Sequence, residues 1–307
     1  MDWMRYKFIF FTLSGLMIVL GILGLFKWGL KFGVDFKGGS LIEYKFEKGI
    51  STEGIDKKLE EEGLKLNSIQ ALGDNKYLLR LASLDKEGKE KLKKVLENLS
   101  YSGVEELRFE TVGPSIGPEL VRKTIYAILI ASGVILAWVA YQFKNLKFGI
   151  SAILAMFHDS FLLIAGYSFL GHFYNVEIDF LFVTALLTTL SFSVHDTIVV
   201  FDRIRESQKK FDDRSKKSSN LLKDSFSRLA NQAVTETMVR SLNNSFTILF
   251  MLTSLILLGG VSIRWFAVAL FLGTILGTYS SPFVAVPLLV SWDKVFRKNP
   301  SKKSKTG

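Results

Sequence analysis

The sequence predicts a polytopic α-helical membrane protein with six transmembrane helices and one extracytoplasmic α+β domain of ferredoxin-like order. Three observations predict this fold class. Six apolar stretches are long enough to cross a bilayer, Lys and Arg gather in alternate loops, and a stretch with soluble-domain patterning separates the first two apolar stretches. The chain is 49% hydrophobic and contains 26 Phe, which is too apolar for an ordinary soluble domain.

The six spans follow from length. A helix rises about 1.5 Å per residue and the hydrocarbon core is about 30 Å thick, so a span needs about 20 apolar residues. We read the first span as an uncleaved anchor, because its apolar run is longer than a signal peptide's and no Ala-x-Ala site follows. The predicted spans are residues 8–26, 124–143, 148–171, 178–201, 246–263 and 265–292.

The distribution of Lys and Arg predicts the orientation of these spans. Residues 144–147 carry two, residues 202–241 carry ten and residues 293–307 carry six, whereas residues 172–177 carry none and residues 259–264 carry one. Cytoplasmic loops hold the excess of basic residues, so both termini are expected in the cytoplasm. The net charge of +10 is then mostly this bias together with a basic tail, for which attraction to anionic lipid is the alternative.

Residues 29–121 form the predicted outer domain. Apolar residues recur at helical spacing in two stretches and alternate in others, and residues 73–75 are typical of a hairpin turn. The resulting β-α-β-β-α-β order is ferredoxin-like. With 15 basic and 17 acidic side chains from Lys31 to Glu119, the domain is a poor nucleic-acid binder. The predicted elements are strand 40–46, helix 52–62, strands 66–72 and 76–82, helix 86–99 and strand 104–112.

The remaining organisation follows from these boundaries. We expect an anchor at residues 1–28, a five-helix bundle at residues 122–292 and a cytoplasmic tail at residues 293–307. Residues 202–241 form a cytoplasmic segment within the bundle. Apolar residues at helical spacing there predict a helix at the membrane surface, with packing against the span ends as the alternative; they are Leu221, Leu222, Phe226 and Leu229.

Motifs of nucleotide and metal chemistry are missing from the sequence. There is no Gly-x-x-x-x-Gly-Lys-Ser/Thr loop, and three His without Cys offer no spaced metal cluster. The glycine-rich residues 33–39 resemble a phosphate loop only superficially, and a tight turn is the expected role. We therefore expect no cofactor and no metal.

Two aspartates, Asp159 and Asp196, lie inside the third and fourth predicted spans. An ionisable side chain at mid-membrane costs about 2.5–3.5 kcal/mol on insertion scales, so it is a functional candidate. Removal from water disfavours the charged form of a carboxyl group, which can then hold a proton when dry and release it when water arrives. The alternative is a hydrogen bond to a neighbouring Ser or Thr that joins two helices. We favour proton chemistry for Asp196 and leave both roles open for Asp159.

His158 and His195 each directly precede one of these aspartates. Neighbouring helix positions point about 100° apart, so a histidine need not face its aspartate. Polar contact with another helix is favoured over a part in a proton relay.

Small and hydroxyl residues mark the last span. Gly273 and Gly277 have the spacing that lets another helix approach closely, and three hydroxyl residues follow. Pro282 and Pro287, within the same span, allow a kink whose freed carbonyls those hydroxyls can satisfy.

Four stretches in this order resemble the SecF family. SecF is the smaller subunit of the SecDF protein-export complex and is similar to half of an RND-type transporter. The resemblance spans nearly the whole chain, and the third stretch is the most specific. The stretches are GVDFKGGSLIEYKF at residues 33–46, VGPSIGPEL at 112–120, HDTIVVFDRIRES at 195–207 and GTILGTYSSPFVAVP at 273–287.

The resemblance implies a proton-driven machine rather than an enzyme. It implies a bacterial or archaeal plasma-membrane location, a SecD partner, the SecYEG translocon, an unfolded preprotein substrate and surrounding membrane lipid. Asp196 falls on the family's functional Asp position. Two rival functions remain open: an RND-like exporter of lipids or hydrophobic small molecules, and an assembly scaffold in which no proton moves.

One residue departs from the family pattern. The family usually has an Arg where this chain has Asn244, and an Asn cannot supply a fixed positive charge. Arg240 lies four residues earlier, on the same helical face. We expect Arg240 to supply the positive charge for Asp196 that Asn244 lacks.

Overall fold

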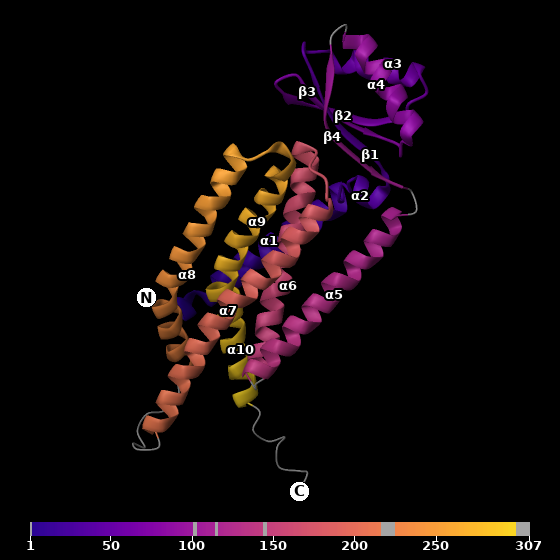
Figure 1. Cartoon of the computed structure of the whole chain (residues 1–307). Helices are drawn as coiled ribbons and strands as arrows, with labels where there is room; N and C mark the ends of the chain where they lie inside the picture. Colours follow the sequence, from indigo (N-terminus) through magenta and orange to yellow (C-terminus); the bar gives the residue numbers. More distant parts are fainter. Residues whose placement is uncertain (1, 101–102, 114–115, 144–145, 216–224, 299–307) are drawn as a thin grey trace. The chain divides into compact units, whose positions relative to one another are not determined.

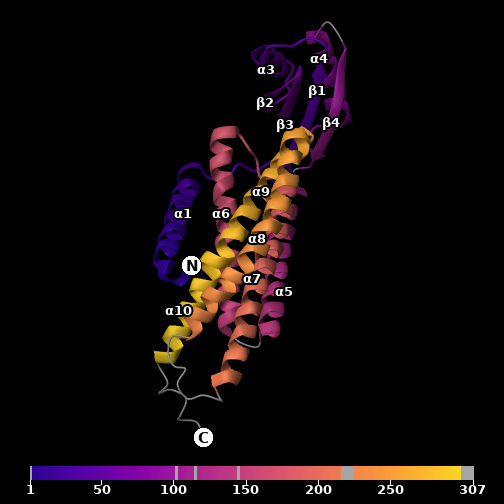
Figure 2. The ribbon, with the colours of Figure 1, turned by 90° about the vertical axis from the view of Figure 1, so that its left-hand side faces the viewer.

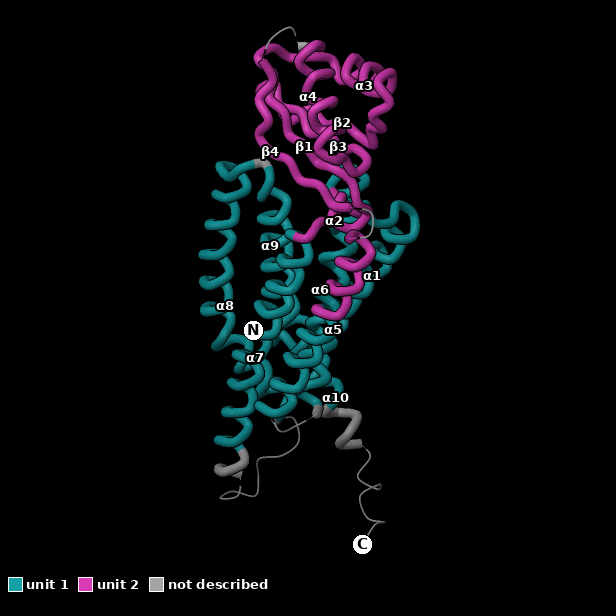
Figure 3. Tube along the Cα trace, turned by 45° about the vertical axis from the view of Figure 1, so that its right-hand side comes forward, with its two compact units in different colours: residues 1–31, 128–176, 181–307 teal, residues 32–127, 177–180 magenta. Residues whose placement is uncertain are grey.

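The computed structural model describes residues 2–100, 103–113, 116–143, 146–215 and 225–298. Its elements are shown in Figure 1, and the chain divides into two compact units (Figure 3). One unit, the bundle, comprises residues 1–31, 128–176 and 181–307. The other, the sheet domain, comprises residues 32–127 and 177–180.

The sheet domain has the predicted ferredoxin-like order. Its four strands pair antiparallel in the order β2-β3-β1-β4, and two helices separate the strands along the chain. Every boundary lies within one residue of its prediction. The elements are β1 (Gly39–Phe46), α3 (Thr52–Glu61), β2 (Leu66–Gly73), β3 (Lys76–Leu81), α4 (Lys86–Ser100) and β4 (Val104–Val112). The glycine-rich residues 33–39, predicted to form a turn, contain the short helix α2 (Val34–Lys37).

The core of this domain lies between the sheet and the two helices. Alternate side chains of β1 and β3 pack with the apolar stripes of α3 and α4, including Ile42, Leu79, Ile55 and Leu96, which are fully buried. The β2–β3 turn consists of two residues with positive φ, Asp74 at 48° and Asn75 at 57°. This is the backbone of a type I′ turn, which matches the twist of the paired strands.

Six helices within the described residues are long and apolar enough to cross a membrane. Figure 2 shows α1 beside α6 and α8 beside α9. The helices are α1 (Lys7–Trp28) after a short 3₁₀ turn, α5 (Ile116–Phe143), α6 (Leu146–Tyr174), α7 (Phe180–Ser215), α8 (Ser225–Leu258) and α9 (Val261–Ser280), followed by a π-helical turn η2 (Ser281–Ala285) and α10 (Val286–Lys298).

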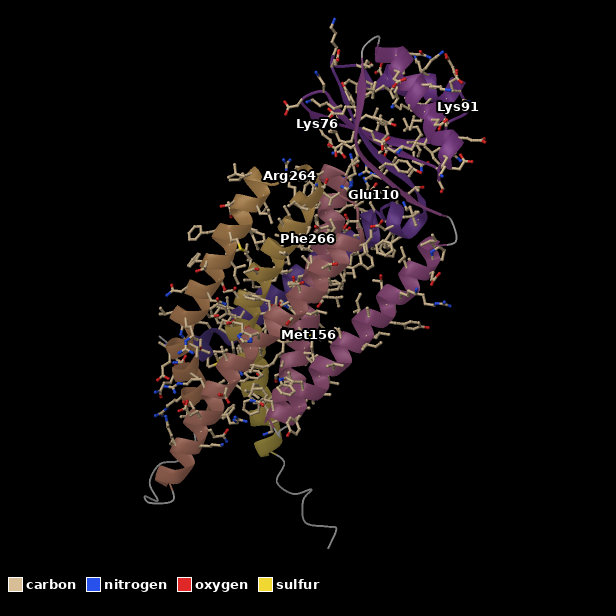
Figure 4. The ribbon with its side chains drawn as sticks, in the orientation of Figure 1. Lys76, Lys91, Glu110, Met156, Arg264 and Phe266 are labelled. Carbon is tan, nitrogen blue, oxygen red and sulfur yellow. The ribbon has the colours of Figure 1, made fainter. Side chains whose placement is uncertain are left out.

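The fifth span differs from its prediction. Helix α8 begins about 20 residues before the predicted residue 246, and Phe226 is buried in the bundle core. Of the two alternatives for this segment, Phe226 therefore follows packing against the spans rather than the membrane surface, because apolar residues at helical spacing serve a protein core as well as a lipid surface. Leu221 and Leu222 lie outside the described residues. Figure 4 shows the packed side chains, among them Met156 on α6, which is 1% exposed.

The predicted close approach at the glycines of α9 is confirmed. A Cβ at Gly273 would overlap the Thr189 side chain of α7, and one at Gly277 would lie 3.2 Å from Phe192 Cδ1. Beyond them Ser281 donates to the Gly277 carbonyl at 3.0 Å, just where the helix widens into the π turn at Pro282. Small residues thus bring α9 against α7, and a hydroxyl satisfies a carbonyl beside the π turn.

Candidate functional site

Asp159 on α6 is held from three directions. Its Oδ2 accepts hydrogen bonds from Ser193 of α7 at 2.6 Å and from Ser280 of α9 at 2.5 Å. Its Oδ1 lies 2.9 Å from His158 Nδ1. The residue is 1% exposed. This carboxylate therefore ties three helices together.

The two histidines differ. His158 is buried against Asp159, and its Nε2 has no partner within the described ranges. His195 is exposed and forms no hydrogen bond or ion pair with Asp196 in the described structure. The angular spacing of adjacent helix positions thus keeps His195 away from Asp196 in the described structure, whereas His158 reaches Asp159.

Asp196 on α7 is held less fully than Asp159. Its Oδ1 accepts a hydrogen bond from Ser241 of α8, and the Ser281 hydroxyl also interacts with the carboxyl group, but no hydrogen bond of ordinary geometry reaches Oδ2 among the residues that the structure describes. Only 8% of the residue is exposed. A buried polar atom without a partner costs free energy, and in a native structure it often marks a functional group.

A pair of adjacent serines links the surroundings of both carboxylates. Ser280 donates to Asp159, while Ser281 is 3.1 Å from the hydroxyl of Thr197, the residue after Asp196. Both serines lie at the start of the π-helical turn. Single π turns within helices occur frequently at functional sites. The site is therefore built from four helices, α6, α7, α8 and α9, around one irregular turn.

Neither predicted counter-charge contacts Asp196. Asn244 and Arg240 are both exposed, and in the described part of the chain Arg240 forms no ion pair. Arg240 lines an open, largely polar pocket between α7 and α8, together with Gln142, Ile198, Val199, Asp202, Arg203, Glu206, Glu236 and Thr237. Its neighbour along the chain, Ser241, makes the contact instead.

Sequence reasoning missed the three serines that contact the carboxylates. Ser280 stood in the hydroxyl run after Gly277, and Ser241 opened the stretch that contains Asn244. Ser193 carried no signal in the sequence, because it lies within an apolar run and matches no motif that marks a contact with another helix. The described residues contain no group of three or more His, Asp or Glu that could hold a metal ion.

Comparisons with known proteins identify the family. Residues 91–295 match the model of the protein export membrane protein SecD/SecF C-terminal family, and residues 24–50 match the SecD/SecF GG motif. The chain is 38% identical to the protein translocase subunit SecF of Thermobaculum terrenum, over 97% of each chain. It is 34% identical to the SecDF subunit of Thermus thermophilus, covering 87% of this chain and 35% of that one.

Solved structures point to the same family as the sequence comparisons. The crystal structure of SecDF from Thermus thermophilus, a translocon-associated membrane protein, superposes on this chain with a TM-score of 0.81 at 32% identity. A SecDF structure in a super-membrane-facing form gives 0.68. The match covers 96% and 97% of this chain but 39% of each SecDF chain. The fold, the two family models and the relatives agree that this chain belongs to the SecF family of protein translocase subunits.

Proposed function

We propose that this chain uses the proton gradient to assist protein translocation across the plasma membrane, with Asp196 as the intramembrane proton carrier. The observation that carries the proposal is the half-bonded state of this buried carboxyl group. Ser241 donates to one oxygen and Ser281 lies close to the carboxyl group, while the second oxygen accepts no hydrogen bond of ordinary geometry from the described residues and can gain or lose a proton. A charge that crosses 100 mV of membrane potential gains about 2.3 kcal/mol, which can bias a packed bundle between two states.

The topology forms part of the proposal. The alternation of basic loops supports both termini in the cytoplasm and the sheet domain on the outer side. The domain layout is an anchor at residues 1–28, an outer domain at 29–121, a bundle at 122–292 and a tail at 293–307. Residues 202–241 then lie at the cytoplasmic face.

The proposed partner in the membrane is SecD. Relatives named SecDF are longer chains, of which this chain spans 35% in Thermus thermophilus and 37% in Bacillus subtilis. In the proposed assembly the remainder is supplied by a separate SecD subunit, and the complex works beside the SecYEG translocon on an unfolded preprotein, within lipid.

The decisive experiment compares three versions of the chain. Gradient-dependent preprotein translocation is measured in vesicles that contain SecD and the translocon, with wild type, Asp196→Asn and Asp159→Asn side by side. Asp196→Asn should abolish the stimulation by the gradient, because an amide cannot carry the proton. Asp202→Asn, an exposed aspartate on the same helix, is the matched control and should retain it.

The outcomes separate the rivals. Normal stimulation in an assembled Asp196→Asn complex would contradict proton carriage and favour the scaffold. Wild-type vesicles that export a lipid or a hydrophobic small molecule without any effect on preprotein would favour the exporter. Loss of stimulation in Asp159→Asn as well would extend proton coupling to Asp159.

The counter-charge needs its own test. We propose that Arg240 compensates for Asn244 by reaching Asp196 when the carboxyl group ionises, since it lies next to Ser241. Arg240→Gln should then reduce the gradient-stimulated rate, while Arg240→Lys should retain most of it. A normal rate in Arg240→Gln would rule out this role and leave Ser241 as the group that positions Asp196, to be tested with Ser241→Ala.

A further inference from the structure

An apolar groove of about 260 Å³ runs between α8 and the end of α9. The two helices lie side by side (Figure 2), and both belong to candidate membrane spans. The groove is smaller than the roughly 300–1,000 Å³ of pockets that hold drug-sized ligands. Because its α8 wall is partly exposed, the groove opens toward the membrane hydrocarbon. The α8 residues that line it are Met238, Leu242, Ser245, Phe246 and Leu249.

The opposite wall of the groove is held in place by α1. This wall consists of Ile275, Thr278 and Tyr279 of α9 and Phe283 of the π-helical turn. The ring of Phe283 lies 4.4 Å from the ring of Phe10 in α1, and the Tyr279 hydroxyl donates to the Phe10 carbonyl at 3.3 Å. The groove is therefore already formed without an occupant, as is usual for ligand sites.

The two aliphatic hydroxyl groups in the groove bond to protein atoms. Thr278 donates to the Thr274 carbonyl at 2.7 Å, and the Ser245 and Thr278 hydroxyls lie 2.6 Å apart. Since the Thr278 proton is used, Ser245 donates to Thr278. A polar ligand would give up its bonds to water and gain little from these hydroxyls, whereas a hydrocarbon chain has no such bonds to lose.

The rims of the groove favour a flexible chain over a helix of another subunit. Interfaces between membrane helices are enriched in small residues, which let the two backbones approach closely. Here the rims carry Phe246, Leu242 and Ile275, which are 52%, 37% and 42% exposed. These bulky side chains would keep a helix away, but a single acyl chain can lie between them.

Trp3 lies at the end of the groove where the π-helical turn begins. Its ring is 5.7 Å from the ring of Phe283, and its Nε1 donates to the Thr235 hydroxyl at 3.1 Å. Its backbone amide donates to Asn231 Oδ1 at 2.6 Å. Trp is enriched at the level of the lipid headgroups. The short 3₁₀ turn η1 (Trp3–Tyr6) is thus fixed on α8 where headgroups are expected.

Two basic residues belong to this end of the groove. Arg5 lies in η1, and Arg228 lies three residues before Asn231, on the same face of α8. Both are exposed, and neither has a side-chain hydrogen bond or ion pair within the described ranges. A guanidinium group binds phosphate through two parallel hydrogen bonds, and basic residues near the membrane surface attract anionic lipid. An apolar groove with a basic end matches the two parts of a phospholipid.

We propose that the groove binds one acyl chain of an anionic phospholipid and that Arg5 and Arg228 bind its headgroup phosphate. Under the proposed topology this lipid belongs to the cytoplasmic leaflet. It contacts α8, α9 and η1 together. Its binding requires neither a proton gradient nor a preprotein, so the test below is independent of the proposed function.

Lipid retention is the direct measurement. The full chain is purified in detergent, loaded with dioleoyl phosphatidylglycerol or dioleoyl phosphatidylcholine, and examined by native mass spectrometry. One phosphatidylglycerol should remain on each chain, and phosphatidylcholine should bind several-fold more weakly because its headgroup has no net charge. Free glycerol phosphate, which has no acyl chain, should not compete.

One pair of variants tests the groove. Leu242→Trp places a large ring in the space for the acyl chain and should abolish retention of phosphatidylglycerol. Val239→Trp is the matched control, because Val239 lies one turn away on α8, is 65% exposed and is not among the lining residues. It should retain the lipid as the wild type does.

A second set of variants tests the charges. Arg5→Gln and Arg228→Gln should each weaken retention of phosphatidylglycerol about fivefold and leave phosphatidylcholine nearly unchanged. Arg264→Gln removes the same charge from the first turn of α9, at the other end of the helix pair (Figure 4), and should have no effect. These exposed positions keep the test valid if Leu242→Trp does not fold.

A fluorescent label locates the bound chain. The protein contains no Cys, so Leu249→Cys places one label in the groove, and Met251→Cys places one on the exposed surface of α8 outside it. In phosphatidylcholine bilayers with a small share of phosphatidylglycerol brominated on its acyl chains, the label at 249 should be quenched more strongly than the label at 251.

Three results would overturn the site. They are equal retention of the two lipids by the wild type, unchanged retention in a folded Leu242→Trp together with Arg5→Gln/Arg228→Gln, and equal quenching at the two labelled positions. Addition of SecD provides a fourth test. Release of the lipid by SecD would assign the groove to a helix of the partner, whereas retention supports the lipid site.

Discussion

The two buried aspartates occupy similar sequence contexts and have opposite surroundings. Asp159 follows a His and precedes a Ser, and Asp196 follows a His and precedes a Thr. Asp159 has three polar partners on both oxygens, whereas Asp196 accepts one hydrogen bond of ordinary geometry, from Ser241, with Ser281 close by and its Oδ2 without a bond in the described structure. The comparison teaches that burial alone does not define a working carboxylate. The number of groups that hold it separates a structural junction from a site that can change state.

The largest difference between the two sites should appear in stability. Asp159→Leu leaves Ser193, Ser280 and His158 without their buried partner, so the free energy of unfolding in detergent should fall by about 2–4 kcal/mol. Asp196→Leu removes one hydrogen bond and should cost about 1 kcal/mol. Reversible unfolding monitored by circular dichroism gives both values.

Asp159→Asn is the control for this comparison. Its amide oxygen can accept from both serines and its NH₂ group can donate to His158 Nδ1 in the neutral tautomer. Its unfolding should therefore stay close to that of the wild type. Equal losses for the two leucine variants would abolish the distinction between junction and working site.

A smaller loss of stability is expected from disrupting the close contact between α7 and α9, which supports the Asp159 junction. Gly273→Leu places a side chain where Thr189 of α7 already lies, and such overpacking costs about 1–3 kcal/mol. Thermal unfolding of the purified chain measures it. Gly133→Leu on α5, where no atom of the described structure lies within 4 Å of the added Cβ, should be neutral. A neutral Gly273→Leu would show that α7 and α9 do not need close contact.

The smallest expected effect is on the pH dependence of stability, and it concerns Glu177. This carboxylate has an Arg partner, whereas neither aspartate has one in the described structure. Burial raises the pKa of Glu177, while Arg80 opposes the rise. A raised pKa means that the folded state holds the proton more tightly. The contribution to stability is therefore present below the unfolded pKa and is lost as pH rises through the folded one.

The measurement is thermal unfolding between about pH 4 and about pH 8. Glu177→Gln should remove this part of the pH dependence. Arg80→Gln should extend it to higher pH, because the opposing charge is gone. Identical pH profiles for wild type and Glu177→Gln would contradict the assignment.

Local patterning predicted the sheet domain well. Alternation and helical spacing determine which face of each element is buried, so its boundaries agree to one residue from β1 to β4. The six spans were also predictable, because their length and composition are set by the bilayer. The continuity of α8 was missed: the helix predicted around Phe226 and Leu229 and the fifth span are one helix, because the polar turns between them carry no hydropathy signal.

The site was predicted only in part. Asp159 and Asp196 stand out because a charge in an apolar run is costly. Their partners Ser193 and Ser241 are ordinary helix residues whose roles depend on which helices become neighbours, and one sequence does not reveal that. The same limit applies to residues 33–39, whose glycines indicated a turn but gave no sign of the segment at 177–180 that they contact.

The π turn after α9 gives the two aspartates a common setting. Ser280 and Ser281 are consecutive, and one reaches Asp159 while the other reaches the neighbour of Asp196. A slip of this turn by one residue would rotate both hydroxyls by about 100° at once. Neither contact could then be lost alone. A shift of this turn in the last span would therefore change the surroundings of both aspartates together.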